Sequence, residues 1–162
     1  MKPTDLQTKN LVLIPQTREE ARAQVEQMGP QERAYVSAAW LARLEASSPV
    51  DPWIHGFTIV DRANHGAIGK CGFKGPPGAD GVVEIAYSVA PEHQGKGYAT
   101  EAAEALVAYA VSSGQVRVVR AHTLPQINAS GRVLTKCGFR QVGEVVDLED
   151  GLVWRWELPV EG

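Results

Sequence analysis

The segment with the clearest chemical signature is a glycine-rich turn, Gln94 to Thr100, between a predicted strand and a predicted helix. The first backbone amides of a helix lack intrahelical partners and the peptide dipoles add positive charge there, so phosphate oxygens bind readily. Gly95 and Gly97 keep side chains away from these amides. Small Ala99 leaves them accessible, and the Thr100 hydroxyl either donates to an anion or caps the helix. The turn therefore predicts an anion site.

Two common phosphate-binding motifs do not fit this turn. A Walker A loop needs Ser or Thr after its lysine, whereas Lys96 is followed by Gly97. The dinucleotide fingerprint G-x-G-x-x-G would place Thr100 at its third glycine. An unrelated nucleotide-binding protein is therefore disfavoured. Gln94-Gly-Lys-Gly97-Tyr-Ala99 instead resembles the Q/R-x-x-G-x-G/A motif of the GNAT acetyltransferase superfamily.

The resemblance extends beyond this motif. Residues 83–104 resemble the family's central strand, pyrophosphate loop and helix, and residues 125–139 resemble its second cofactor-flanking helix. The sequence is most similar to the RimJ/RimL type, whose members acetylate protein N-termini or small amines. The resemblance implies acetyl-CoA as the acyl donor and a protein N-terminus or small-molecule amine as the acceptor.

The family's site residues are carried over by position. The resemblance implies that the pyrophosphate lies on the loop made by Gln94, Gly95, Lys96, Gly97, Tyr98, Ala99 and Thr100. It also implies that backbone groups near Ser88, Val89 and Ala90 pair with the pantetheine arm, in a V between the central strand and the strand after the pyrophosphate helix. Many relatives have an asparagine three residues before the serine of the second helix. Here Ile127 is at that position and Asn128 lies two before Ser130, so Asn128 is the candidate cofactor contact.

Glu84 is the first candidate for a general base. An alkyl ammonium has a pKa of about 10, so at neutral pH its proton must be accepted before the nitrogen attacks a thioester. Strand alternation places Glu84 on one face with Ala86 and Ser88, as at the wall of a cleft. The alternative is a structural ion pair with an Arg or Lys on a neighbouring strand.

Ser130 is the candidate for assisting the leaving thiolate, because the family often places a Tyr or Ser near its second helix. The alternative is that the Ser130 hydroxyl bonds its own backbone at the helix start. Four histidines show no paired metal spacing, so no metal site is expected. Cys71 and Cys137 lie far apart and are expected to be reduced thiols, with Cys137 packed at a helix end.

The elements that position these residues follow from periodicity and turn signals. A mixed α/β GNAT-like fold is expected, with a largely antiparallel sheet of about seven strands flanked by four helices. In the last strand, Leu152, Trp154, Trp156 and Leu158 are expected to share the core face. Strands are predicted over 10–15, 57–61, 67–73, 82–89, 116–124 and on both sides of 149–151, and helices over 17–28, 31–46, 99–113 and 128–137.

Composition limits the function classes. With 162 residues and 44% hydrophobic content, one domain over residues 1–162 is expected. A net charge of −3 disfavours nucleic-acid or anionic-membrane binding. No apolar run reaches the roughly 20 residues of a membrane span and no secretory signal is evident, so a cytoplasmic protein is expected. The oligomeric state stays open, with a homodimer allowed.

Two functions remain from the sequence. The first is an N-acetyltransferase that uses acetyl-CoA and transfers the acetyl group by direct attack, without an acyl-enzyme. The second is a non-catalytic acyl-CoA-binding or regulatory domain that retains the loop. The loop from Gln94 to Thr100 is compatible with both.

Overall fold

The described part of the chain forms one continuous sheet with helices around it. A computed structural model describes residues 5–33, 38–47, 51–147 and 151–160. Within these residues the strands follow the order β1-β2-β3-β4-β5-β6-β8-β7, and neighbouring strands are antiparallel except β5 and β6. The strands are β1 (Leu6–Gln7), β2 (Leu11–Pro15), β3 (Phe57–Asp61), β4 (Ala67–Phe73), β5 (Val82–Val89), β6 (Val118–Thr123), β7 (Arg140–Asp147) and β8 (Gly151–Pro159).

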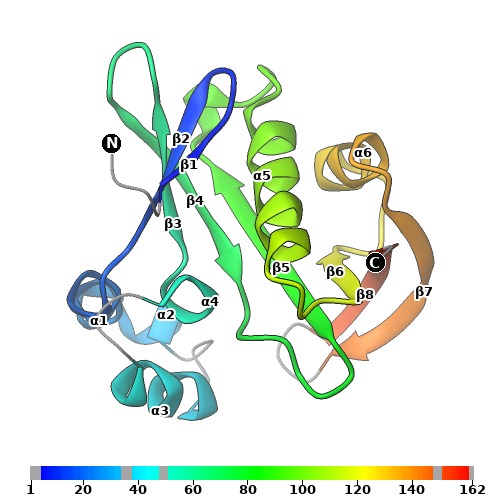
Figure 1. Ribbon diagram of the computed structural model, residues 1–162, viewed down its shortest axis with the longest axis horizontal. Helices are drawn as coiled ribbons and strands as arrows, with labels where there is room; N and C mark the ends of the chain where they lie inside the picture. The colour runs from blue at the N-terminus through cyan, green and yellow to red at the C-terminus, as the bar shows by residue number, and fades with distance from the viewer. Residues whose placement is uncertain (1–4, 34–37, 48–50, 148–150, 161–162) are drawn as a thin grey trace.

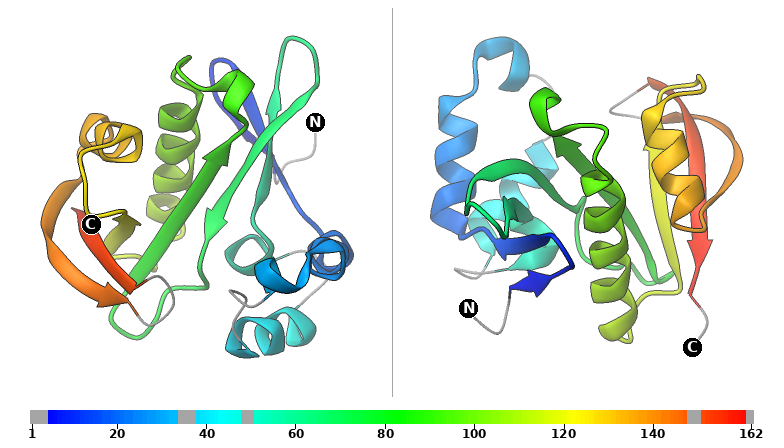
Figure 2. Two further views of the ribbon diagram at one scale, coloured as in Figure 1. Left: turned by 180° about the vertical axis from the view of Figure 1, so that it is seen from behind. Right: turned by 90° about the horizontal axis from the view of Figure 1, so that it is seen from above.

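The helices divide into two groups. Helices α5 and α6 flank the region between β5 and β6, whereas α1 to α4 gather near the ends of β3 and β4, on the side away from α6 (Figures 1 and 2). The helices are α1 (Arg18–Gln27), α2 (Pro30–Arg33), α3 (Ala38–Ala46), α4 (Pro52–His55), α5 (Tyr98–Ser112) and α6 (Ala129–Lys136), with a short 3₁₀ helix at Pro91–His93.

Helix α5 closes the core against β2, β4 and β5. Its core-facing side is formed by Ala102, Ala103, Leu106 and Ala110, which are fully buried. Small alanines on this face let the helix approach the sheet closely. The N-terminus of α5 follows the end of β5 after a short turn.

The V-shaped opening between β5 and β6 is present. Parallel pairing joins only residues 82–84 of β5 to residues 118–120 of β6. Beyond Glu84, β5 continues to Val89 alongside β4, while β6 continues alongside β8. The two strands therefore separate toward the end of β5 that leads into the glycine-rich turn (Figure 1).

Several predicted elements are corrected by the structure. The sheet has eight strands in the described residues, because the two-residue β1 pairs with β2 at one edge. The helix predicted over 31–46 is described as α2 and α3, with residues 34–37 outside the described part, and a further short helix, α4, precedes β3. In α3 the described alanines at 38, 42 and 46 are exposed, whereas Leu44 is buried.

The last strand also departs from simple alternation. Trp156 is buried, but Leu152 is 50% exposed and Val153, on the opposite face, is buried. Leu152 pairs with Val146 near the end of the β7–β8 hairpin, beyond the reach of the helical layer, which explains its exposure. No helix among the described residues is long and apolar enough to cross a membrane.

Candidate active site

A cavity of about 460 Å³ lies where the turn after β5 meets α5 and α6. It is lined by most of the residues predicted for the cofactor. The cavity lining includes Tyr87, Ser88, Val89, His93, Gln94, Gly95, Gly97, Tyr98, Ala99, Thr100, Ala129, Ser130, Arg132, Val133 and Lys136. Three predicted cofactor residues are not part of this lining: Ala90 and the exposed Lys96, which adjoin it in sequence, and Asn128, which lines a neighbouring cavity.

The turn has a backbone that only glycine adopts easily. Gly95 and Gly97 have φ angles of 79° and 83°, in the left-handed region. A Cβ atom at either position would meet no described atom within 4 Å, so the backbone conformation, and not crowding, selects glycine here. Gly97 is the N-cap of α5, which excludes the predicted alternative of Thr100 as the cap.

The amides at the start of α5 point out of the helix end. The first helical hydrogen bond runs from Glu101 N to Gly97 O at 3.1 Å. The N–H groups of Tyr98, Ala99 and Thr100 precede that bond and have no intrahelical acceptor. With Lys136 and Arg132 also lining the cavity, this end of the cavity is suited to an anion.

The backbone of β5 offers hydrogen-bonding groups to the opened side. Ala90 N donates to Ile68 O, and Lys74 N donates to Glu84 O. The backbone groups of the even-numbered residues of β5 therefore point toward β4. In an antiparallel ladder this pairing alternates, so the backbone groups of Tyr87 and Val89 face away from β4. Gln94 Nε2 donates to Val89 O at 2.9 Å and ties the turn to the end of the strand. Of the three positions predicted for pantetheine pairing, Val89 thus has its backbone on the open side, whereas Ser88 and Ala90 pair with β4.

Helix α6 forms the opposite wall of this cavity. Asn128 is its N-cap, with Oδ1 accepting from Gly131 N at 3.0 Å, so the predicted cap is confirmed. Asn128 lines a neighbouring cavity beside Trp154 and Trp156, and its predicted cofactor contact stays a prediction. Ser130 lines the cofactor cavity, and its carbonyl accepts from the Tyr87 hydroxyl at 3.3 Å.

A second cavity, of about 320 Å³, adjoins the first. Tyr87 and Ser88 of β5 line both, so the two cavities meet at these residues. The second cavity is bounded by α1, α3, α4 and the strands β3 to β5. Its lining is Gln16, Gln24, Trp40, Ile54, His55, Gly56, Phe57, Lys70, Cys71, Gly72, Phe73, Ala86, Tyr87 and Ser88.

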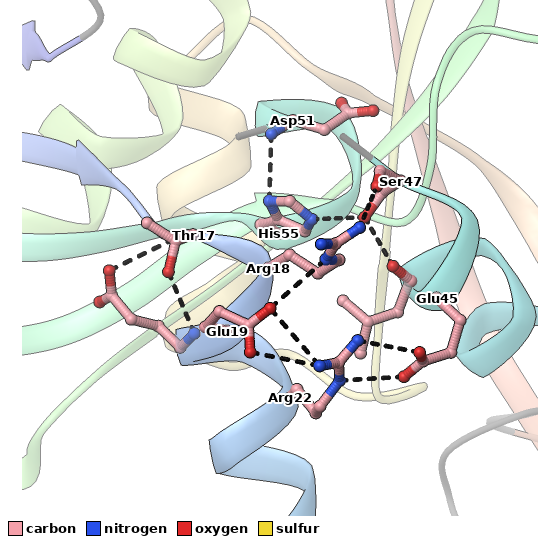
Figure 3. Close-up of polar contacts among 10 residues, drawn as sticks. Thr17, Arg18, Glu19, Arg22, Glu45, Ser47, Asp51 and His55 are labelled. Atoms are coloured by element: carbon pink, nitrogen blue, oxygen red, sulfur yellow. Dashed lines mark hydrogen bonds and ion pairs between the residues drawn. The ribbon is translucent and has the colours of Figure 1, made fainter. Parts of the chain in front are cut away.

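The helical wall of the second cavity is fixed by a polar network (Figure 3). His55 is buried, and its Nδ1 accepts from Asp51 N at 3.0 Å while Nε2 lies 2.8 Å from Ser47 Oγ. Both ring nitrogens are therefore engaged, and burial lowers the His55 pKa, so the ring is neutral and structural. Arg18 Nη1 donates to Ser47 O at 2.8 Å and joins α1 to the end of α3.

Glu84 lies in a charged cluster on β5, near the point where the V begins. Its Oε2 is 2.9 Å from Lys74 Nζ and 3.3 Å from His122 Nδ1, and His122 Nδ1 is 3.9 Å from Asp147 Oδ1. Lys74 is therefore a partner for the structural ion pair that is the alternative role of Glu84. Side-chain atoms of Glu84, His122 and Asp147 that are able to bind a metal ion lie within 4.8 Å of one another. The ammonium of Lys74 already supplies a positive charge to Glu84 Oε2, the oxygen nearest His122.

The tautomer of His122 follows from its other contact. Arg155 Nε donates to His122 Nε2 at 3.2 Å, so this nitrogen accepts and a neutral ring carries its proton on Nδ1. The His122 side chain is 5% exposed, and Nδ1 has no hydrogen bond of good geometry within the described residues. Nδ1 lies 3.3 Å from Glu84 Oε2, so the ring stands beside the carboxylate without a hydrogen bond to it. Spacing in sequence could not indicate this contact, because it depends on the parallel register of β5 and β6.

Tyr87 is a site residue that the loop motif does not include. It is only partly buried, because the separation of β6 opens this face of β5 into the cofactor cavity. Burial, opposed in part by its bond to Ser130, raises the pKa of Tyr87 to about 12, so its phenol stays protonated at neutral pH. It can therefore donate a hydrogen bond where the two cavities meet.

The two thiols match their predicted structural role. Both cysteines are free, and burial raises the pKa of each, with that of Cys137 reaching about 11. A thiol with a raised pKa is protonated at neutral pH and is a poor nucleophile. Cys137 Sγ lies 3.8 Å from Thr100 O and packs the end of α6 against the start of α5.

Comparison with known proteins agrees with the fold. The model of the acetyltransferase (GNAT) domain family matches residues 5–140. This match covers most of the chain, and the chain belongs to this family, as its loop motif predicted.

Individual relatives are more distant. The chain is 32% identical over 99 residues to the N-acetyltransferase YjdG of Bacillus subtilis, which covers 61% of this chain and 56% of that protein. The chain spans about half the length of the curated relatives it matches. A GNAT-family acetyltransferase structure from Bordetella pertussis is 27% identical, with a TM-score of 0.67 over 95% of this chain and 98% of that chain.

The fold of the chain is also that of a RimL structure. The structure of RimL, a ribosomal L7/L12 α-N-protein acetyltransferase in complex with coenzyme A, has a TM-score of 0.68. The alignment covers 96% of this chain and 98% of that chain, at 14% identity.

Proposed function

We propose that this protein is an acetyl-CoA-dependent N-acetyltransferase that transfers the acetyl group to a primary amine by direct attack. The observation that carries the proposal is the meeting of the two cavities at Tyr87 and Ser88. One cavity has the anion-binding end expected for a coenzyme A pyrophosphate, and the other offers an open pocket to an acceptor. Donor and acceptor would thus approach each other at one point on β5.

The roles of individual residues follow from their places. The amides at the start of α5, with Gln94 to Thr100, would hold the pyrophosphate, and Val89 would pair with the pantetheine arm. Acetyl-CoA supplies the acetyl group as a thioester. The amine nitrogen forms a bond to the carbonyl carbon, the carbon–sulfur bond breaks, and the pair of electrons leaves on sulfur. A thiol has a pKa of about 8.5, so the thiolate departs without a strong acid.

The proton of the acceptor ammonium needs a base. Glu84 lies on the same strand face as Ala86 and Ser88, about 13 Å along the strand from Ser88 at roughly 3.3 Å per residue. A proton would reach Glu84 over that distance through water. Ser130, on the wall opposite Tyr87, would offer its hydroxyl to the departing sulfur.

The second candidate function is a domain that binds acyl-CoA without turnover. The ion pair between Glu84 and Lys74 favours it, since a carboxylate engaged with an ammonium is less available as a base.

One experiment separates the two functions. Purified protein is given acetyl-CoA with a panel of peptides carrying free N-termini and of small amines, and release of free thiol is followed while calorimetry measures coenzyme A binding. The proposal expects binding, and thiol release that depends on an added amine. Binding without release for every amine would support the non-catalytic domain, and absence of binding would refute both.

A further inference from the structure

The acceptor cavity, defined by the fourteen lining residues given above for the second cavity, has an unusual charge balance for a site that takes an amine. No carboxylate lines it within the described part of the chain. His55 is neutral, which leaves Lys70 as the one charged side chain of the described lining. A site for a polycationic amine would be expected to present acidic groups, so this lining disfavours such acceptors.

Lys70 is placed beside the point of transfer. It pairs in register with Ser88, its neighbour on the adjacent antiparallel strand, and Ser88 lines both cavities. Directly opposed residues have Cβ atoms about 5 Å apart. The Lys70 side chain is exposed and has no ion-pair partner within the described residues, unlike Lys74 four positions on, which pairs with Glu84. Its ammonium is thus available to a ligand.

The rest of the lining is largely apolar and aromatic. Trp40, Ile54, Phe57 and Phe73 supply hydrocarbon surface, and the side-chain amide of Gln24 supplies a neutral polar group. Ligand sites combine such apolar walls with a few polar groups that fix orientation. A volume of about 320 Å³ is at the lower end for such sites, so the part of the acceptor held here is small.

From these features we infer that the acceptor is a primary amine that also carries a carboxylate and an apolar group, with the carboxylate held by Lys70. A hydrophobic α-amino acid has this chemistry, and so does a peptide whose N-terminal residue has an acidic side chain. The inference rests on the proposed function, since it names the acceptor for the same transfer.

A cation beside the transfer point also acts on the amine itself. It repels an ammonium and thus favours the neutral, nucleophilic form of a nearby nitrogen. A carboxylate on the acceptor offsets this repulsion for the molecule as a whole and draws it into the cavity. Lys70 therefore both attracts a carboxylate-bearing amine and favours its neutral nitrogen, whereas a polyamine has no group that Lys70 attracts.

The test compares acceptors that differ only in the carboxylate. Values of kcat/KM are measured by thiol release for L-phenylalanine, L-phenylalaninamide, spermidine, and two peptides with N-terminal Glu or Gln. Charge-assisted hydrogen bonds are the strong ones, so a preference of at least about tenfold for the carboxylate partner is expected in one of the two matched pairs. Which pair shows it distinguishes a free amino acid from a peptide. Spermidine is expected to be the poorest acceptor.

Variants at Lys70 show whether this residue is responsible. In Lys70→Gln the preference for the carboxylate partner is expected to fall to about twofold or less, and in Lys70→Glu it is expected to reverse. Lys9→Gln, which removes an exposed cation outside the acceptor cavity, is the matched control and is expected to keep the wild-type preference. Coenzyme A affinity is measured for all variants and is expected to stay unchanged.

The outcomes are distinguishable. Equal kcat/KM values for acceptors with and without the carboxylate, or a higher value for spermidine, would overturn the inference and leave the proposed function intact. A Lys70→Gln variant that loses coenzyme A affinity and slows all acceptors equally also overturns it, because Lys70 would then belong to the donor site. Binding of acetyl-CoA with no turnover of any amine overturns the proposed function, and the inference with it.

Discussion

His122 Nδ1 lies 3.3 Å from Glu84 Oε2 across the last paired residues of β5 and β6. Arg155 Nε donates to the other ring nitrogen, so a neutral ring carries its proton on Nδ1, the nitrogen nearer the carboxylate. Lys74 contacts the same oxygen from the opposite strand, and Asp147 approaches the ring from β7. A cluster of this kind orients a carboxylate at the place where the two strands begin to separate.

Glu84→Gln tests the proposed base. The substitution keeps the shape and removes the basicity, so turnover is expected to fall by a factor of about 100 or more with acetyl-CoA affinity intact. Raising the pH is expected to restore part of the rate, because more of the amine is then neutral. Rates are measured from neutral to alkaline pH with one accepted amine.

A matched variant separates catalysis from the ion pair. Lys74→Gln removes the partner of Glu84 and keeps the carboxylate. If the pair were only structural, both variants would lower the melting temperature alike and weaken donor and acceptor binding together. Near-wild-type turnover of Glu84→Gln at neutral pH would eliminate Glu84 as the base.

His122 is expected to act through Glu84. His122→Ala should lower turnover roughly tenfold in the wild type and have little further effect in the Glu84→Gln background, because contacting residues are not additive. The double-mutant cycle, run on kcat with melting curves for all four proteins, measures this coupling. Equal losses in both backgrounds would show that His122 does not work through the carboxylate.

Gly97→Val is expected to abolish coenzyme A binding. A valine at a φ of 83° costs about 1–2 kcal/mol of backbone strain, so the turn is expected to leave the conformation that presents the first amides of α5. Gly114→Val is the control, since Gly114 has a φ of 72°, equally open surroundings and a place at the far end of the same helix. Calorimetry should show binding for the control alone, and coenzyme A binding equally well to Gly97→Val and wild type would refute the donor site.

Asn128→Ala removes the cap of α6. Loss of the bond from Gly131 N to Asn128 Oδ1 is expected to lower the free energy of unfolding by about 1 kcal/mol. Asn128→Asp keeps an acceptor and should retain most of that stability. Urea denaturation gives the stabilities and calorimetry the coenzyme A affinity; a loss of affinity without loss of stability would point to the predicted cofactor contact instead of the cap.

Much of the site was predictable because it is local in sequence. In the segment from Val82 to Ser112 the spacing of apolar residues changes from strand to helix period at two glycines, which predicts the strand, the turn and the helix. The cap at Asn128 is predicted by its residue type. Elements of two and four residues, β1 and α4, carry too little periodicity to be recognised.

The remaining features depend on contacts between strands. Tyr87 alternates with Ala86 and Ser88 as a core residue should, and it lines a cavity only because β6 diverges from that face. The neighbours Lys70 and Ser88, like His122 and Glu84, meet through strand registers that sequence spacing does not specify.

The last prediction concerns pH and the start of α5. Burial alone would raise the pKa of Glu101, but hydrogen bonds from the side chains of Asn10 and Thr8 and from Asn10 N outweigh it and lower the pKa. A lowered folded pKa means that this stabilisation is present above the ordinary value near 4.5 and is lost as pH falls through the folded value. Glu101→Gln is therefore expected to cost about 1 kcal/mol at neutral pH, with the difference from wild type shrinking at acid pH as the wild-type carboxylate is protonated. Urea denaturation of both proteins from pH 7 to about pH 3 measures the difference, with Glu104→Gln, an exposed carboxylate on the same helix, as a control expected to show little change. A difference between Glu101→Gln and wild type that stays constant with pH would show that the carboxylate charge does not join the β1–β2 hairpin to α5.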